Sequence, residues 1–317
     1  MYTIGIDLGG TGVQAGVVDE NNNIIGRGER PTNMPRPADE IMDDVAAACR
    51  DAVEQAGLTM DDITCVGIGS PGTANSSTGI IEFAGNLGMK QYPMAKALTD
   101  RLGKEVYLAN DADSAAYGEV MAGAAKGHDN VVCITLGTGV GGGVIIDGRI
   151  ITGFNHAGGE LGHTVIVENG IPCNCGRSGC WEKYASATAL INQTRDAMEG
   201  DPNSAMWQIA GSLEKVNGKT AFDGMRAGDP TACTVVEKYI YHVACGLINV
   251  INVFQPAILC IGGGISKEKE NLLAPLRAIV EKERFSKYAA QQTELVAAQL
   301  GNDAGIIGAA NLYRLKK

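Results

Sequence analysis

Four residues near the middle of the chain have the types and spacing of a metal site. Cys173, Cys175 and Cys180 lie within eight residues of one another, and His163 lies ten residues before Cys173. One imidazole and three thiolates form a closed tetrahedral ligand set that is typical of structural zinc and has no open position for a substrate. Buried free thiols are the alternative interpretation. We predict zinc here, and we expect the other cysteines to be core residues on apolar segments: Cys49, Cys65, Cys133, Cys233, Cys245 and Cys260.

Carboxylates stand beside this cluster and at one earlier position. Glu160 and Glu182 flank the cluster, and a folded metal loop should bring them towards each other, where they could accept hydrogen bonds from vicinal sugar hydroxyls. Asp111 follows the strand-like segment Val106–Ala109 and precedes a helical pattern that starts near Ser114. Phosphoryl transfer to an alcohol needs a carboxylate that accepts the hydroxyl proton, and a helix N-terminus would keep it ionised. On position alone, however, a plain N-cap is the better interpretation of Asp111.

Three glycine-rich turns could contact phosphates. They lie at Gly9–Gly12, Gly137–Gly143 and Gly262–Gly264, each directly after an apolar, strand-like segment. Glycine lets the backbone approach a ligand closely, and exposed N–H groups in such turns form an anion-binding concavity. Any one turn alone would be interpreted as a tight hairpin, but the three together favour a nucleotide site. Asp7, at the end of the first strand, could hold Mg²⁺ through water, or could simply be a turn carboxylate.

The elements around these turns indicate a duplicated architecture. Strand-like segments at 3–8 and 131–136 run through the first two turns into returning strands at 13–18 and 144–148. A P-loop or a Rossmann fingerprint would instead lead from a strand into a helix, so both are disfavoured. The pattern recurs after ~130 residues, which suggests two related α/β domains. Helical periodicity predicts helices at 38–56, 230–254 and 305–315, and the segment 63–69 is strand-like.

Composition limits the function classes. The 317 residues are 45% hydrophobic with a net charge of −10, which suits a globular protein and argues against nucleic acid as the main partner. The N-terminus has no pattern of a targeting signal, and no apolar run reaches membrane-spanning length. We therefore expect a cytoplasmic protein with no membrane partner.

Together these motifs resemble the ROK family of bacterial sugar kinases and repressors over essentially the whole chain. Asp7–Thr11 and Leu136–Gly143 are similar to the two phosphate motifs of the actin/hexokinase superfamily, and Gly262–Ser266 is similar to its adenosine motif. Gly159–His163 with Cys173–Glu182 is similar to the signature that is specific to ROK proteins. The resemblance implies a two-domain actin-like ATPase fold of the ribonuclease H-like type. Residues 1–112 with the C-terminal helix 301–317 would form a small domain, and residues 113–300 a large one with the zinc loop and a dimerisation surface.

The resemblance also implies roles for individual residues. Asp111 would be the catalytic base for the sugar 6-hydroxyl, and His163 would hold zinc with one ring nitrogen while the other faces the sugar. The residues implied to bind the sugar are Asn86, Asn110, Asp111, Glu160, His163 and Glu182. Those implied to bind ATP and Mg²⁺ are Asp7, Gly9, Gly10, Thr11, Gly12, Thr138, Gly139, Gly262, Gly263 and Gly264. Two positions depart from the family pattern: Gly12 stands where Lys or Asn is common, and Met89 stands where many glucokinases have Trp.

The activity that the resemblance implies is an ATP-dependent glucokinase with small-molecule sugar and nucleotide partners, which forms a homodimer or homotetramer. A kinase of another hexose or hexosamine, such as mannose, allose or N-acetylglucosamine, is the alternative within this class, and polyphosphate is an alternative donor. A repressor would need a DNA-binding helix–turn–helix before the first strand, and the strand pattern starts at residue 3. A non-catalytic sugar or ATP sensor is disfavoured by the presence of Asp111 and all three turns.

Overall fold

The structure is a computed structural model in which residues 1–315 are described, and these residues divide into two compact units. The first unit comprises Met1–Val131, Gly143–Gly159 and the described part of Gln299–Lys317, and the second comprises Val132–Gly142 and Glu160–Ala298. The first unit therefore extends further than residue 112 and includes the helix that begins at Asp111. The domain boundary at residue 112 stays a prediction.

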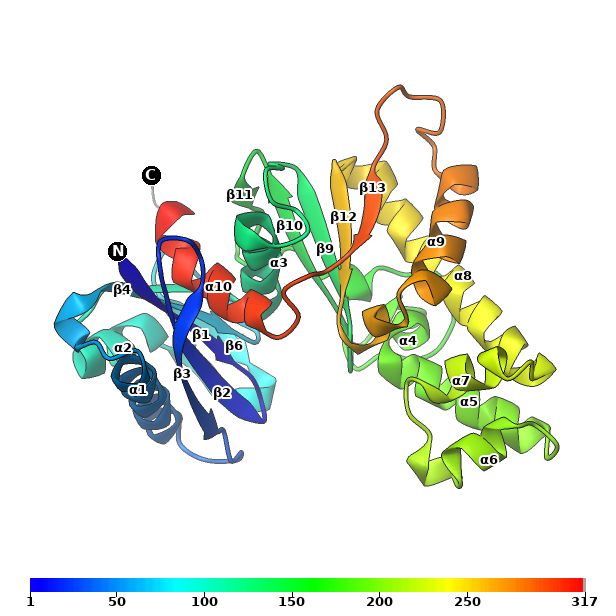
Figure 1. The fold of residues 1–317 in the computed structure, drawn as a ribbon, viewed down its shortest axis with the longest axis horizontal. Helices are drawn as coiled ribbons and strands as arrows, with labels where there is room; N and C mark the ends of the chain where they lie inside the picture. The colour runs from blue at the N-terminus through cyan, green and yellow to red at the C-terminus, as the bar shows by residue number, and fades with distance from the viewer. Residues whose placement is uncertain (316–317) are drawn as a thin grey trace. The chain divides into compact units, whose positions relative to one another are not determined.

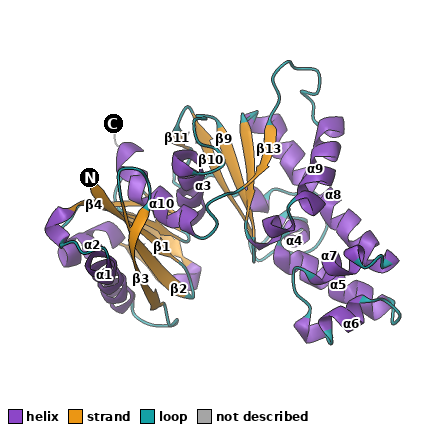
Figure 2. Ribbon diagram, in the orientation of Figure 1, coloured by secondary structure: helices purple, strands orange, loops and turns teal. Residues whose placement is uncertain are grey.

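The chain contains two five-stranded sheets (Figure 2). The first sheet has the order β3-β2-β1-β4-β8, and the second has the order β11-β10-β9-β12-β13. The strands of the first are β1 (Tyr2–Leu8), β2 (Gly12–Val18), β3 (Ile24–Pro31), β4 (Ile63–Ser70) and β8 (Val106–Asn110). Those of the second are β9 (Val131–Leu136), β10 (Val140–Ile146), β11 (Arg149–Ile150), β12 (Ile258–Gly262) and β13 (Glu294–Ala297). The equivalent order, with a hairpin at the same place, confirms the duplicated α/β architecture.

Helices and a small sheet complete the units. In the first unit these are α1 (Ala38–Gln55), α2 (Met94–Leu102), α3 (Asp111–Ala122), α10 (Asp303–Asn311) and an antiparallel sheet of β5 (Thr73–Asn75), β6 (Ile80–Ala84) and β7 (Met89–Tyr92). The second unit contains α4 (Glu182–Ala185), α5 (Ala187–Gly200), α6 (Met206–Ala210), α7 (Thr220–Arg226), α8 (Pro230–Phe254) and α9 (Glu270–Glu283). Short 3₁₀ turns are η1 (Met60–Asp62), η2 (Gly85–Leu87), η3 (Leu161–His163), η4 (Leu213–Lys215), η5 (Gly264–Glu268) and η6 (Leu312–Leu315).

Alternation along β1 explains how the first sheet is covered on both faces (Figure 1). Ile4 and Ile6 are fully buried in a core cluster that includes the apolar side of α1. Gly5 points to the other face, where a Cβ atom would overlap the carbonyl oxygen of Ile306 in α10. Gly67 in β4 makes the same close approach to Ala309. Successive strand residues point to opposite faces, so the glycines let α10 lie directly on the backbone of the sheet.

Several element boundaries and cysteine environments differ from expectation. The returning strand β10 begins at Val140 rather than Val144, because Gly141–Gly143 continue the strand instead of extending the turn. Helix α3 begins at Asp111 rather than near Ser114. The predicted helix 305–315 is α10 followed by the 3₁₀ turn η6. Of the six cysteines expected in the core, Cys233 and Cys245 are only half-buried, because α8 is partly exposed there.

Within residues 1–315, none of the helices combines the length and the hydropathy that crossing a bilayer requires.

The close approach of α10 predicts a strong effect of Gly5→Ala. The added methyl group cannot be accommodated without moving α10 from the sheet, so the free energy of unfolding should fall by roughly 2–4 kcal/mol. Gly200→Ala is the matched control, since nothing lies near its Cβ position at the end of α5. Urea unfolding followed by circular dichroism measures both variants. Equal stability of Gly5→Ala and the wild type would contradict this packing.

Candidate functional site

Parallel pairing in the first unit places three predicted site residues at one edge of the sheet. Strands β1, β4 and β8 run parallel, with Asp7 opposite Gly69 and Ser70 opposite Asn110. Their carboxyl ends therefore meet at the same edge, which is where open α/β sheets bind ligands. Asp7, Asn110 and Asp111 all lie there, although more than a hundred residues separate Asp7 from Asp111 in the sequence.

Asn110 is the N-cap of α3. Its Oδ1 accepts hydrogen bonds from Ala112 N (2.8 Å) and Asp113 N (3.4 Å), and its Nδ2 donates to the Gly72 carbonyl at 3.1 Å. Asp111 is the first residue of the helix, so interpreting it as a plain N-cap was wrong. The signal that could have shown this is the Asn itself, which is a preferred N-cap residue directly before a helix with acidic residues in its first turn. Asp111 Oδ1 accepts a hydrogen bond from Ala112 N at 2.9 Å.

Burial perturbs both carboxylates at this edge. It raises the pKa of Asp7 to about 6, and the nearby negative charge of Asp111 adds to the effect. Burial also raises the pKa of Asp111, while hydrogen bonds from the backbone and from Asn110 oppose that change. Desolvation disfavours a charge, and two neighbouring carboxylates disfavour each other's ionisation. A cluster of this kind is typical of a functional site or of a site for a cation.

The first glycine turn adjoins this edge. Gly9 N–H donates to the Gly12 carbonyl at 2.8 Å and closes the turn between β1 and β2. Asn86, in η2, lies beside the turn, with its Nδ2 3.6 Å from where a Gly10 Cβ atom would be. The structure thus brings together the first-unit residues that the sequence singled out: Asp7, Gly9, Gly10, Thr11, Gly12, Asn86, Asn110 and Asp111.

In the second unit, the second and third glycine turns lie next to each other. Gly137 N–H donates to the Gly139 carbonyl at 3.0 Å, which closes the turn between β9 and β10. Gly263 has a φ of 84° and packs on the backbone of Leu136, so a side chain at this position is excluded by space as well as by conformation. Thr138 and Gly139 therefore share one end of this unit with Gly262, Gly263 and Gly264.

Glu182 contacts the second turn directly. Its Oε2 accepts a hydrogen bond from Val140 N at 3.1 Å, and a Cβ atom on Gly139 would overlap this same oxygen. Glu160 lies beside His163, with its Oε2 at 4.0 Å from His163 Nε2. The sequence did not indicate the contact between Glu182 and the turn, because 42 residues separate Glu182 from Val140.

The four candidate metal ligands converge. Their ligand atoms lie within 4.8 Å of one another. Cys173 Sγ is 3.6 Å from His163 Nδ1, and Cys175 Sγ is 3.5 Å from Cys180 Sγ. Thiolates around a tetrahedral zinc ion with bonds of about 2.3 Å would be about 3.8 Å apart, so the spacing fits that metal. His163 turns Nδ1 towards the cysteines and Nε2 towards Glu160, which gives the two ring nitrogens different surroundings.

The metal loop, defined as residues 173–182, is fixed to α8 through Trp181. This side chain is fully buried, and its Nε1 donates to the His242 carbonyl at 2.9 Å. Gly246 makes room for the indole, because a Cβ atom there would overlap the ring. Trp181 lies between the candidate ligand Cys180 and Glu182, so packing of one buried indole helps to position both neighbours.

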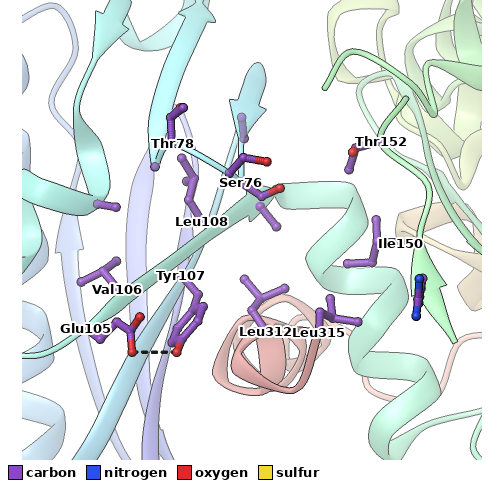
Figure 3. A pocket seen from close by; sticks show the side chains of 16 residues that line it. Ser76, Thr78, Glu105, Val106, Tyr107, Leu108, Ile150, Thr152, Leu312 and Leu315 are labelled. Atoms are coloured by element: carbon purple, nitrogen blue, oxygen red, sulfur yellow. Dashed lines mark hydrogen bonds between the residues drawn. The ribbon is translucent and has the colours of Figure 1, made fainter. Parts of the chain in front are cut away.

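The first unit also contains a cavity of about 510 Å³ alongside β8 (Figure 3). Glu105 accepts a hydrogen bond from the Tyr107 hydroxyl at 2.8 Å on one wall, and Leu312 and Leu315 form another wall. None of the predicted site residues lines this cavity, so its volume does not identify the candidate site.

Comparison with known proteins places these features in one family. The chain matches the ROK family over residues 3–316. It is 38% identical to the glucokinase of Streptomyces coelicolor over 315 residues, which cover 98% of this chain and 97% of that protein. The chain belongs to the ROK family. The glucokinase of Thermotoga maritima is also 38% identical, over 98% of this chain and 96% of its own length.

A solved relative supports the same assignment. The crystal structure of a ROK family glucokinase from Streptomyces griseus, in complex with glucose and AMPPNP, superposes with a TM-score of 0.83 at 36% identity. The match covers 98% of this ROK chain and 99% of that chain. The protein therefore has the actin-like ATPase fold expected from the resemblance. The roles of the individual site residues stay predictions.

The raised pKa of Asp7 predicts a pH-dependent stability gain in Asp7→Asn. A folded-state pKa above the unfolded value means that Asp7 contributes stability below its usual pKa of about 4 and loses it as pH rises through about 6. The variant has no carboxylate at this position and therefore lacks this loss. The free energy of unfolding of the variant minus that of the wild type should increase by about 1 kcal/mol between pH 5 and pH 7.5.

Urea unfolding without magnesium at both pH values tests this prediction. Asp61→Asn, which removes an exposed carboxylate from the same unit, is the control and should show little pH-dependent difference. The same difference at both pH values in Asp7→Asn would mean that Asp7 is not perturbed in the folded protein.

Proposed function

We propose that this protein transfers the γ-phosphate of ATP to the 6-hydroxyl of glucose. The observation that carries the proposal is the placement of Asp111, a partly buried carboxylate with a raised pKa at the carboxyl edge of the first sheet, in a chain similar to glucokinases over nearly its full length. Glucose bound with AMPPNP in the Streptomyces griseus relative supports this pair of substrates.

In the proposed mechanism, Asp111 accepts the proton of the 6-hydroxyl as the sugar oxygen forms a bond to the γ-phosphorus and the bond to the β,γ-bridging oxygen breaks. The products are glucose 6-phosphate and ADP. Since Asp111 must be ionised to act and burial raises its pKa, activity should decline as the pH falls towards that raised pKa. Asn110 fixes the start of α3 and so the position of Asp111.

The glycine turns supply N–H donors to the phosphates, and the sugar hydroxyls contact Asn86, Asn110, Glu160, His163 and Glu182. Magnesium, when bound with ATP, offsets phosphate charge, and Asp7 is the carboxylate of this chain that could hold it through water. The pair of partly buried carboxylates, Asp7 and Asp111, supports a cation here, because a nearby positive charge would favour their ionised forms.

The cluster of His163, Cys173, Cys175 and Cys180 is proposed to hold a structural zinc ion. With four protein ligands the site is closed, so the metal contributes to folding of the loop and not to the reaction. His163 is also proposed to face the sugar through Nε2, with Glu160 nearby.

Substitution of Asp111 tests the reaction. Asp111→Asn keeps a group that can accept from Ala112 N but cannot take the proton, so kcat should fall at least about 100-fold. Glucose binding, measured by calorimetry, should persist within a few-fold. Asp129→Asn, which changes an exposed carboxylate of the same unit, should keep wild-type turnover in a coupled ADP-release assay. Near-normal turnover of Asp111→Asn would remove Asp111 from the role of base.

Substitution of Cys175 tests the metal. Cys175 is exposed, so Cys175→Ser loses little packing but removes one thiolate ligand. We expect most of the bound zinc to be lost in elemental analysis, together with a lower melting temperature and folded yield. Cys233→Ser, on α8 and outside the cluster, should keep its zinc. A zinc-free Cys175→Ser protein with the stability of the wild type would refute a structural metal.

A further inference from the structure

We infer that Thr32 and Thr188 are positioning residues for the first and second glycine turns, an inference that rests on the proposed function. Both threonines lie outside every motif identified in the sequence. Each donates its hydroxyl to a carbonyl of a turn that is proposed to bind phosphate. The two arrangements occur in different units and use the same chemistry.

In the second unit, two donors at the start of α5 hold the turn between β9 and β10. Thr188 Oγ1 donates to the Thr138 carbonyl at 2.8 Å. Ala187 N–H donates to the Gly137 carbonyl, also at 2.8 Å. Hydrogen bonds thus hold two successive carbonyls of the turn, those of Gly137 and Thr138, in orientations that point towards α5.

In the first unit, Thr32 alone provides both donors for the turn between β1 and β2. Its Oγ1 donates to the Gly9 carbonyl at 2.7 Å, and its N–H donates to the Thr11 carbonyl at 3.1 Å. Thr32 follows directly after β3 and is fully buried. The packing around Thr32 therefore holds the hydroxyl in place, and the hydroxyl cannot donate a hydrogen bond to solvent instead.

Peptide geometry connects these carbonyls to the proposed phosphate contacts. In a planar trans peptide, the carbonyl of one residue and the N–H of the next point in opposite directions. Fixing the Gly9 carbonyl therefore directs Gly10 N–H to the side away from Thr32. Fixing the Thr138 carbonyl directs Gly139 N–H away from Thr188 in the same way.

Both of these N–H groups are candidate donors to a ligand. Within residues 1–315, neither Gly10 N–H nor Gly139 N–H is a donor among the backbone–backbone hydrogen bonds of turns and loops. Glycine on both sides of the Gly9–Gly10 peptide and on one side of the Thr138–Gly139 peptide lowers the resistance to a peptide flip. Such a flip would replace the donor by a carbonyl oxygen facing the phosphates. The threonine hydroxyls stabilise the orientation in which the donor faces the ligand, so they act on the nucleotide through the turn and not by contact.

Thr188→Val provides the sharpest test, because the side chain is exposed and valine keeps its shape. Loss of one hydrogen bond should raise the KM for Mg·ATP and the dissociation constant for AMPPNP about fivefold. The KM for glucose, the melting temperature and the zinc content should not change. Thr188→Ser, which retains the hydroxyl, should return the ATP parameters to near wild type.

Thr234→Val is the matched control, since this exposed threonine donates to the Pro230 carbonyl on α8, away from the turns. It should leave the kinetics unchanged. Thr32→Ser and Thr32→Val form the corresponding pair in the first unit, and only Thr32→Val should raise the KM for ATP. A wild type that turns over ATP beside a Thr188→Val variant with unchanged ATP parameters would overturn the inference alone. Absence of sugar-dependent turnover in the wild type would instead count against the proposed function.

Discussion

Two partly buried carboxylates at the carboxyl edge of one parallel sheet are the constraint on which the rest of the site depends. Asp7 and Asp111 lie at the ends of β1 and β8, where burial opposes the ionised form of each and the charge of Asp111 further raises the pKa of Asp7. A bound cation would stabilise the ionised forms of such a pair, and a ligand that donates a proton would relieve the repulsion between the two charges. A substrate hydroxyl and a magnesium-bound nucleotide together would meet both needs, which is why the pair is interpreted as the centre of a phosphotransferase.

The duplicated topology explains why the phosphate turns have a common design. Each sheet places a tight glycine turn between its first two antiparallel strands, and each turn is held by threonine and backbone donors from a later segment. In the second unit the same later segment follows the metal loop: Cys180, Trp181 and Glu182 precede the start of α5 by a few residues. A metal that orders this loop would therefore also order the surroundings of the second turn, without taking part in the reaction.

Local sequence signals predicted much of this architecture, and contacts between distant segments account for what they missed. The 25-residue helix α8 has a Pro at its start and a Pro soon after its end, and the structure has it at the predicted residues. The three cysteines and His163 could be grouped from spacing, because the ligands are close in sequence. In contrast, the bond from Val140 N to Glu182 joins residues 42 positions apart, and the role of Asn110 depended on where α3 begins. The first residues of β10 were also not predicted as strand, since three glycines in succession usually indicate a turn.

The most direct test of the account is the rate of ADP release by zinc-replete protein with Mg·ATP, measured with glucose, mannose, allose and N-acetylglucosamine in turn. We predict the highest kcat/KM with glucose, with one glucose 6-phosphate formed for each ADP. A higher kcat/KM with another sugar would contradict the assignment of glucose and leave Asp111 as the base. ADP release that no sugar stimulates would contradict the account as a whole.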